Sequence, residues 1–217
     1  MATGEDIAAI AACFGCSPET AQLLMQSTLQ RTFNHRQPIA YRGDPSDCLF
    51  LVLTGAVVSE IFGAEGQQAQ LTRHGPGELF GAYPEATAHR ADLCAQGETR
   101  MLAIPTTRME QLARENAEIG AGLARLMARQ LDLVLDRMAA RIGLSASGRF
   151  HRALLQLADE RGHIEPAPVI SALALSVHTS RETGSRAISA LVRRGIVERR
   201  DNALRIVSRR LLEEMVI

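Results

Sequence analysis

The residues best suited to chemistry in this sequence lie between Thr179 and Gly195. At about 100° per residue on a helix, five polar residues share one arc of roughly 140°: Arg181, Glu182, Ser185, Arg186 and Ser189. The opposite side carries small and apolar residues, namely Gly184, Ala187, Ile188 and Leu191. Arginine can pair with guanine through two N–H groups, and glutamate can accept from cytosine N4. The pattern predicts a helix that packs through one face and presents base-reading groups on the other.

The two ends of this helix also carry signals. Thr179-x-x-Glu182 has the form of a capping box, in which each side chain satisfies a free N–H group of the other residue. Arg193 and Arg194 suit the negative end of the helix, and Gly195 suits a left-handed cap. The alternative for such a segment alone is a charged amphipathic surface helix.

The flanking segments favour a DNA-binding unit over that alternative. Residues 171–177 predict a short helix of small residues, and His178 occupies the turn that follows. Residues 196–200 and 203–207 predict a hairpin around Asp201-Asn202. Two short helices followed by a hairpin describe a winged helix-turn-helix. We expect further DNA contacts, to the phosphates in the case of the wing arginines, from Thr179, Ser180, Ser185, Ser189, Arg199, Arg200 and Arg205.

The charge distribution agrees with a DNA-binding unit in the carboxyl-terminal part of the chain. The 217-residue chain has a formal net charge of 0, which by itself argues against a nucleic-acid partner. However, residues 1–142 hold 12 arginines against 16 acidic residues (net −4), whereas residues 143–217 hold 12 against 8 (net +4). A basic carboxyl-terminal part beside an acidic front is expected when only one domain meets phosphate.

The front of the chain predicts a different architecture. Residues 5–30 predict short helices, one of them starting at Ser17-Pro18-Glu19. From residue 31 to 105, short apolar runs alternate with glycine-rich turns at 43–45, 63–66 and 75–77, which favours a β-sandwich or barrel. The expected strands are 38–41, 48–53, 56–62, 68–73, 90–96 and 100–104.

A long helix should connect the two parts. After a short helix at 106–116, residues 117–142 predict one helix whose apolar residues exceed the single narrow stripe of a surface helix. We expect one face on the β domain and another on a second copy of the chain; the alternative is a helix buried within one chain. The expected dimer contacts are Leu123, Leu126, Met127, Leu131, Val134 and Met138. Residues 143–148 form the expected hinge, followed by helices at 150–161 and 208–215.

Arg181-Glu182-Thr183-x-x-Arg186 resembles the recognition helix of the CRP/FNR family of bacterial transcription regulators, and more narrowly that of its cyclic-AMP receptor protein branch. The resemblance covers nearly the whole chain. It implies an α+β fold with a cyclic-nucleotide-binding-like jelly roll (1–108), a dimerisation helix and hinge (109–146) and a winged helix-turn-helix (147–217). It also implies a homodimer on a palindromic TGTGA-type site, whose half-sites Arg181, Glu182 and Arg186 would read.

Two residues depart from the family pattern in the helix-turn-helix. His178 replaces the usual turn glycine, and Gly184 stands where the family has an apolar core residue. Because glycine costs a helix up to about 1 kcal/mol relative to alanine, we expect the recognition helix to order fully only on DNA.

The ligand site that the resemblance implies is degenerate. Relatives that bind cyclic AMP have Gly-Glu where this chain has Gly81-Ala82, and Arg-Ser where it has Arg90-Ala91. The Thr and Ser that meet adenine correspond to Val134 and Leu135. Each lost charge-assisted bond is worth roughly 1.5–3 kcal/mol, so cyclic AMP is not the expected ligand. Arg90 would then bind another anion or form a surface ion pair.

Other cofactors of the family leave alternatives open. An iron–sulfur cluster would need Cys13, Cys16, Cys48 and Cys94, but the family's distant cysteine position is Leu102 here, and simple packing explains the thiols equally. A haem would need His35, His74 or His89 as axial ligand, and each also suits an exposed loop. A redox or haem sensor, and an effector-independent DNA binder, are the alternative functions.

No enzymatic constellation is present in the sequence: HExxH, a nucleophile elbow and a phosphate loop are all missing. The first residues lack the charge pattern of a signal peptide, and the longest apolar run, 49–58, is too short to span a bilayer. We therefore expect a cytoplasmic, non-enzymatic regulator with no membrane partner. By resemblance, the loop at 162–168 would contact RNA polymerase.

Overall fold

The computed structural model describes residues 4–62 and 68–217, and it divides the chain into two compact units, Met1–Leu133 and Val134–Ile217. The boundary falls within one long helix, α4 (Ala117–Gly143). Within the described residues, no single helix is long and apolar enough to cross a membrane; α1 and α2 would suffice together by length and composition only, but they are bent by 109°.

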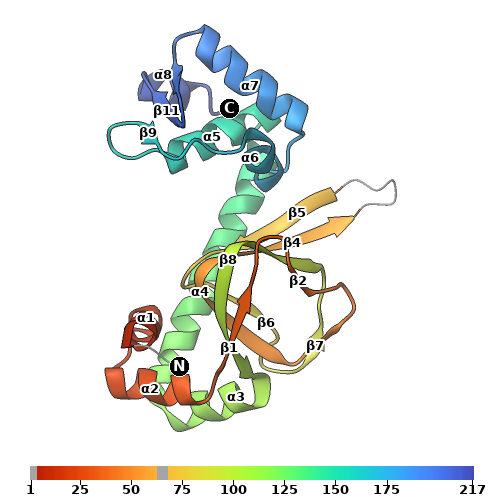
Figure 1. The fold of residues 1–217 in the computed structure, drawn as a ribbon, viewed down its shortest axis with the longest axis vertical. Helices are drawn as coiled ribbons and strands as arrows, with labels where there is room; N and C mark the ends of the chain where they lie inside the picture. The colour runs from red at the N-terminus through yellow and green to blue at the C-terminus, as the bar shows by residue number, and fades with distance from the viewer. Residues whose placement is uncertain (1–3, 63–67) are drawn as a thin grey trace. The chain divides into compact units, whose positions relative to one another are not determined.

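The first unit contains an antiparallel sheet in the order β1 (Leu29–Phe33), β8 (Asp92–Pro105), β4 (Cys48–Phe62) and β5 (Gln68–His74). Two short strands extend it: β2 (Pro38–Ala40) pairs with β8, and β6 (Leu79–Gly81) pairs with β4. A second small sheet pairs β3 (Pro45–Ser46) with β7 (Thr87–Ala88). The strands enclose a core of Val52, Val57, Phe80, Leu93 and Met101. This is the predicted jelly roll (Figure 1).

The strands at 48–53 and 56–62 were predicted separately but form one strand, β4. Gly55 has a positive φ of 71°, and the pairing register of β4 with β8 shifts on both sides of Thr54. The glycine therefore marks a bulge within a continuous strand rather than a turn. In the same way, 90–96 and 100–104 join in β8. The turn predicted at 63–66 lies outside the described residues.

Helices cover one side of this sheet. α1 (Gly4–Phe14) and α2 (Pro18–Gln26) precede the sheet, and α3 (Thr106–Glu115) and the first half of α4 follow it (Figure 1). The predicted start of α2 is confirmed, because the Ser17 side chain accepts a hydrogen bond from the Thr20 N–H. Side chains from all four helices pack with β4, β6 and β8 in one apolar core.

The second unit is a winged helix-turn-helix, as predicted (Figure 1). Its helices are α5 (Ala146–Leu157), α6 (Ile170–Ser176), α7 (Arg181–Arg193) and α8 (Arg209–Glu214). Its sheet has the order β10 (Val197–Arg200), β11 (Ala203–Ile206) and β9 (His163–Ile164). β9 was not predicted, and it lies in the loop where we expected a polymerase contact. The core contains Phe150, Leu154, Ile188, Leu191 and Leu212.

The predicted hinge at 143–148 is too long. Ser145 caps α5 by accepting from the Gly148 N–H at 2.9 Å, so the helix starts at Ala146 rather than at Phe150. Only Leu144 and Ser145 separate α4 from α5.

Candidate nucleic-acid interface

The start of α7 differs from the predicted capping box. Ser180, not Thr179, is the N-cap, and its Oγ accepts from the Thr183 N–H at 3.0 Å. The Thr179 N–H instead donates to the Ala174 carbonyl in the preceding turn. Glu182 lies 3.6 Å from Arg186 in an i,i+4 ion pair. Its carboxylate is therefore placed on the exposed face of the helix, away from a capping role.

The predicted division of α7 into two faces is present. The five polar residues of the predicted arc are all exposed: Arg181, Glu182, Ser185, Arg186 and Ser189. Gly184, Ala187, Ile188 and Leu191 are buried in the core of the second unit. The first three turns of α7 thus offer two guanidiniums, a carboxylate and two hydroxyls, the donors and acceptors that pair with base edges in a major groove.

Gly184 has a packing role that the sequence did not reveal. A Cβ atom at this position would lie 2.9 Å from the Ala174 Cβ on α6 and 3.1 Å from the Phe150 Cε2 on α5. The missing side chain allows α7 to approach both helices closely. α7 is a continuous helix packed at Gly184. That it orders fully only on DNA stays a prediction.

His178 forms the turn between α6 and α7 in the left-handed region, with φ of 55°. This is the conformation that glycine adopts most easily. Arg149 on α5 donates to the carbonyls of Val177 (2.8 Å) and His178 (2.9 Å). Burial, followed by the charges of Arg141, Arg149 and Arg137, lowers the pKa of His178 below its usual 6.5. Burial and the neighbouring cations thus both disfavour the protonated imidazole.

The wing presents two of its three predicted arginines. Arg199 and Arg200 are exposed, and Arg200 lies 3.3 Å from Glu198 in the same strand. Arg205 is only half-exposed, and its Nε is buried with no hydrogen-bond partner in the described part of the chain. The wing therefore supplies Arg199 and Arg200 as groups suited to phosphate.

Three of the predicted ligand-site residues of the first unit, Gly81, Ala82 and Ala91, carry no polar side-chain group. Ala82 and Ala91 are 1% and 6% exposed, and the Ala82 N–H donates to the Cys48 carbonyl at 2.9 Å. Gly81 has a positive φ of 105°. Arg90 is exposed and forms no ion pair within the residues that the structure describes, so the surface-pair alternative is not found there.

The other two predicted ligand residues, Val134 and Leu135, lie in the second half of α4 and are exposed. Among the predicted dimer contacts, Leu123 and Leu126 are buried at 3% and 4% in the core of the first unit. Their assignment to a dimer interface is wrong, because the chain's own α1 and sheet already cover that face of α4. Met127 packs at the edge of the same core, whereas Leu131, Val134 and Met138 are exposed.

The four cysteines are reduced thiols, and burial raises the pKa of each of them. For Cys48, burial and the neighbouring Asp47 carboxylate raise the pKa to about 11. Metal ligation requires thiolates, and within 4–62 and 68–217 no three His, Cys, Asp or Glu side chains gather closely enough to hold a metal ion. The structure does not bring the cysteines together as cluster ligands.

Two of the three candidate haem ligands, His35 and His74, have other side-chain contacts. His35 accepts from the Gly97 N–H through Nδ1 at 3.0 Å. His74 stacks on Phe80, and its Nε2 lies 2.9 Å from the Thr72 hydroxyl. His89 is half-buried, and burial lowers its pKa. None of the three lines the apolar cavity formed by Ile10, Phe14 and Leu24 with the sheet.

Comparison with known proteins matches both units. The model of the cyclic nucleotide-binding domain matches residues 30–116, and that of the Crp-like helix-turn-helix domain matches residues 148–215. The chain is 33% identical over 208 residues to the cyclic AMP receptor protein of Thermus thermophilus, covering 93% of this chain and 94% of that protein.

Two further matches extend across most of the chain. A CRP-like cAMP-activated global transcriptional regulator of Mycobacterium tuberculosis is 25% identical over 201 residues, covering 88% of this chain and 90% of that protein. The structure of FixK2 from Bradyrhizobium japonicum superposes with a TM-score of 0.73 at 21% identity, covering 87% of this chain and 96% of that one. The last comparison bears on the fold alone.

Proposed function

The chain belongs to the CRP/FNR family of transcription regulators, with a helix-turn-helix DNA-binding domain, and from this premise we propose that it binds a palindromic TGTGA-like site as a homodimer without control by cyclic AMP. The observation that carries the proposal is the exposed polar face of α7. Arg181, Glu182 and Arg186 lie on its first two turns, where a recognition helix contacts bases.

Each of these three residues has a distinct part in the proposed contact. Both arginines are exposed and can pair with guanine O6 and N7, and the Glu182 carboxylate can accept from a cytosine amino group. The 3.6 Å pair between Glu182 and Arg186 orients both groups before DNA arrives. Thr179, Ser180, Ser185, Ser189, Arg199 and Arg200 complete the proposed surface with hydroxyl and guanidinium donors for phosphate.

The exposed apolar side chains of α4 support the homodimer. Five of them are spaced as a helical stripe, with exposed fractions of 41–82%: Leu131, Val134, Leu135, Met138 and Ile142. The intervals of four, three and four residues between Leu131, Leu135, Met138 and Ile142 are those of a coiled-coil seam. A second copy that covers this stripe would supply the second recognition helix that a palindrome requires.

The absence of cyclic AMP control rests on the chemistry of the ligand site. Buried methyl groups of Ala82 and Ala91 stand where relatives that bind the nucleotide have a carboxylate and a hydroxyl. Arg90 alone could meet a cyclic phosphate. Since the two curated relatives carry cyclic AMP in their names, the nucleotide must be tested directly. A contact of the 162–168 loop with RNA polymerase stays a prediction.

The test is a fluorescence-anisotropy titration of the full chain onto a palindromic TGTGA-type duplex and onto a scrambled duplex, at one fixed salt concentration. Both titrations are run with and without cyclic AMP. We expect tight binding to the palindrome in both conditions and weak binding to the scrambled duplex. Binding that needs cyclic AMP would contradict the proposed nucleotide independence. Equal binding to both duplexes would contradict the proposed site.

A further inference from the structure

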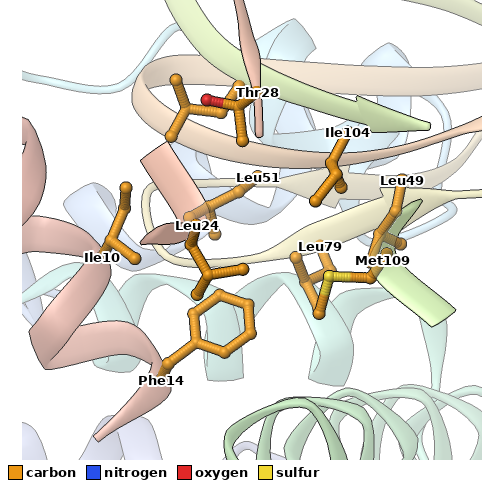
Figure 2. A pocket seen from close by; sticks show the side chains of 10 residues that line it. Ile10, Phe14, Leu24, Thr28, Leu49, Leu51, Leu79, Ile104 and Met109 are labelled. Atoms are coloured by element: carbon orange, nitrogen blue, oxygen red, sulfur yellow. The ribbon is translucent and has the colours of Figure 1, made fainter. Parts of the chain in front are cut away.

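An apolar cavity lies inside the first unit, between α1, α2 and the sheet (Figure 2), and Ala82, Arg90 and Ala91 are not among the residues that line it. Ile10 and Phe14 line it from α1 and Leu24 from α2, whereas Leu51 and Ile104 face them from the sheet. The space open to the centre of a water-sized molecule is about 20 Å³. By that measure a single water needs roughly 10–15 Å³, so the cavity has room for one molecule somewhat larger than water.

The lining favours an apolar occupant. Its side chains carry one hydroxyl, that of Thr28, which already donates to the Met25 carbonyl at 2.8 Å. A buried water typically needs two to four hydrogen-bond partners, and cavities lined by Leu, Ile and Phe stay dry and take up benzene or xenon. Water would therefore be poorly held in this site, and an apolar molecule would recover contacts that the lining side chains lack.

One lining residue also contacts α4. A Cβ atom on Gly122 would lie 2.8 Å from the Phe14 Cδ1, so the bare helix backbone packs directly on the Phe14 ring. Arg125, one turn further along α4, donates to the Phe14 carbonyl at 2.6 Å. Glu118, one turn before Gly122, accepts from the Ser17 N–H and hydroxyl at 2.9 and 2.8 Å. These hydrogen bonds hold the α1–α2 pair against one face of α4. Phe14 lies between that face and the cavity.

We propose that this cavity binds one small apolar molecule, of the size of xenon or a short hydrocarbon, and that α4 senses its occupancy through Phe14. The site is separate from the degenerate nucleotide site, and it does not depend on the proposed DNA sequence. Hydrophobic contact supplies the binding, and an occupant that pushes on Phe14 displaces α4 because the ring already packs on the bare backbone at Gly122.

The test uses the full chain with ¹³C-labelled Ile and Leu methyl groups and xenon as the probe. Raising the xenon pressure should shift the methyl signals of Ile10, Leu24 and Ile104 saturably. The methyl signals of Ile164 and Ile188, in the core of the second unit, serve as internal references and should stay in place. Equal shifts in both cores, or none that saturate in the first, would overturn the site.

Two variants at one position sharpen this test. Leu24→Phe adds a ring to a lining side chain and should abolish the saturable shifts, whereas Leu24→Met conserves volume and should retain them. Retention of the shifts in Leu24→Phe would place xenon elsewhere and overturn the site. The amide signals of Gly122 and Arg125 report on α4: we expect them to shift with the same saturation curve. If the methyl signals of the lining residues shift while the amide signals of Gly122 and Arg125 do not, Phe14 does not transmit occupancy to α4.

Discussion

The guanidinium of Arg149 donates from Nη2 to the carbonyl oxygen of His178 at 2.9 Å. Its Nε donates to the Val177 carbonyl at 2.8 Å, and its Nη1 to the Leu144 carbonyl at 3.0 Å. One side chain on α5 therefore holds the turn that precedes α7 and the segment that follows α4. Because His178 occupies a left-handed conformation that is unfavourable for most residues, we infer that this turn depends on the hydrogen bonds of Arg149.

Arg149→Lys should lower the free energy of unfolding by about 1–3 kcal/mol. The lysine ammonium keeps the charge but lacks the planar guanidinium that reaches three carbonyls. Some of these carbonyls would therefore lose their hydrogen bond. Arg152→Lys on the same helix is the matched control, with an expected change within about 0.5 kcal/mol. Urea unfolding measures both. Equal stability of the two variants would show that the three hydrogen bonds contribute little.

Substitution of His178 should change how stability depends on pH. Its pKa is lowered in the folded chain, first by burial and then by Arg141, Arg149 and Arg137, so the unfolded chain binds the proton more strongly. Stability is therefore lost as the pH falls below the unfolded value of 6.5. His178→Asn removes the titration while asparagine tolerates the left-handed turn.

Thermal unfolding of both proteins across about pH 5 to 8 tests this account. The wild type should lose stability relative to His178→Asn on acidification, and their difference should be constant above neutrality. The lowered pKa of His89 affects both proteins alike and cancels in the comparison. If the wild type gains stability relative to the variant at low pH, the pKa of His178 is raised rather than lowered in the folded chain, and the account is wrong.

Gly184→Ala should destabilise the second unit although alanine favours helices. The added methyl would meet Ala174 at 2.9 Å and Phe150 at 3.1 Å. Overpacking costs about 1–3 kcal/mol, whereas helix propensity returns about 1 kcal/mol, so we expect a net loss of up to about 2 kcal/mol. Gly143→Ala at the end of α4, where nothing lies within 4 Å, should cause no loss. Calorimetry of both variants would show which effect dominates.

The periodicity of the sequence predicted features that depend on a single helix, and it failed for features that depend on the packing of two elements. The two faces of α7 follow from helical spacing, and they are present. Thr179 and Ser180 are equivalent caps by sequence, and only the hydrogen bond from the Thr179 N–H to Ala174 settles the choice. Leu123 and Met138 both belong to apolar stripes of α4, but periodicity alone cannot show which stripe the chain itself covers.

The wing and the β domain show the same limit. β9 has only two residues, too few for an alternation pattern, and it exists because β11 pairs with it. Gly55 falls between the predicted strands 48–53 and 56–62, and in the structure it lies in a bulge opposite β8, so both runs belong to one strand. The Phe14–Gly122 contact joins residues more than 100 positions apart, and no local pattern indicates it.

Met138→Glu should disrupt the proposed homodimer. Met138 is 54% exposed at the centre of the α4 stripe, and a carboxylate facing its symmetry mate would be desolvated without a partner. We expect the dimer dissociation constant to rise at least about 100-fold, or about 2.8 kcal/mol. Asp136→Arg, on the opposite side of α4, is the control and should leave association unchanged. Sedimentation equilibrium measures both; a wild type that sediments as a monomer would contradict the proposed dimer.

Arg181→Ala should remove one base-specific contact from each half-site. A bidentate arginine–guanine pair is worth about 1–3 kcal/mol of discrimination, so binding to the palindrome should weaken and tolerance for other bases at one position should increase. Arg193→Ala, at the far end of the same helix, removes the same charge without touching the base-reading turns. Anisotropy titrations on the palindrome, single-base variants and scrambled DNA separate the two effects. If Arg181→Ala weakens all duplexes equally, Arg181 contacts phosphate and the proposed reading of the half-site is wrong.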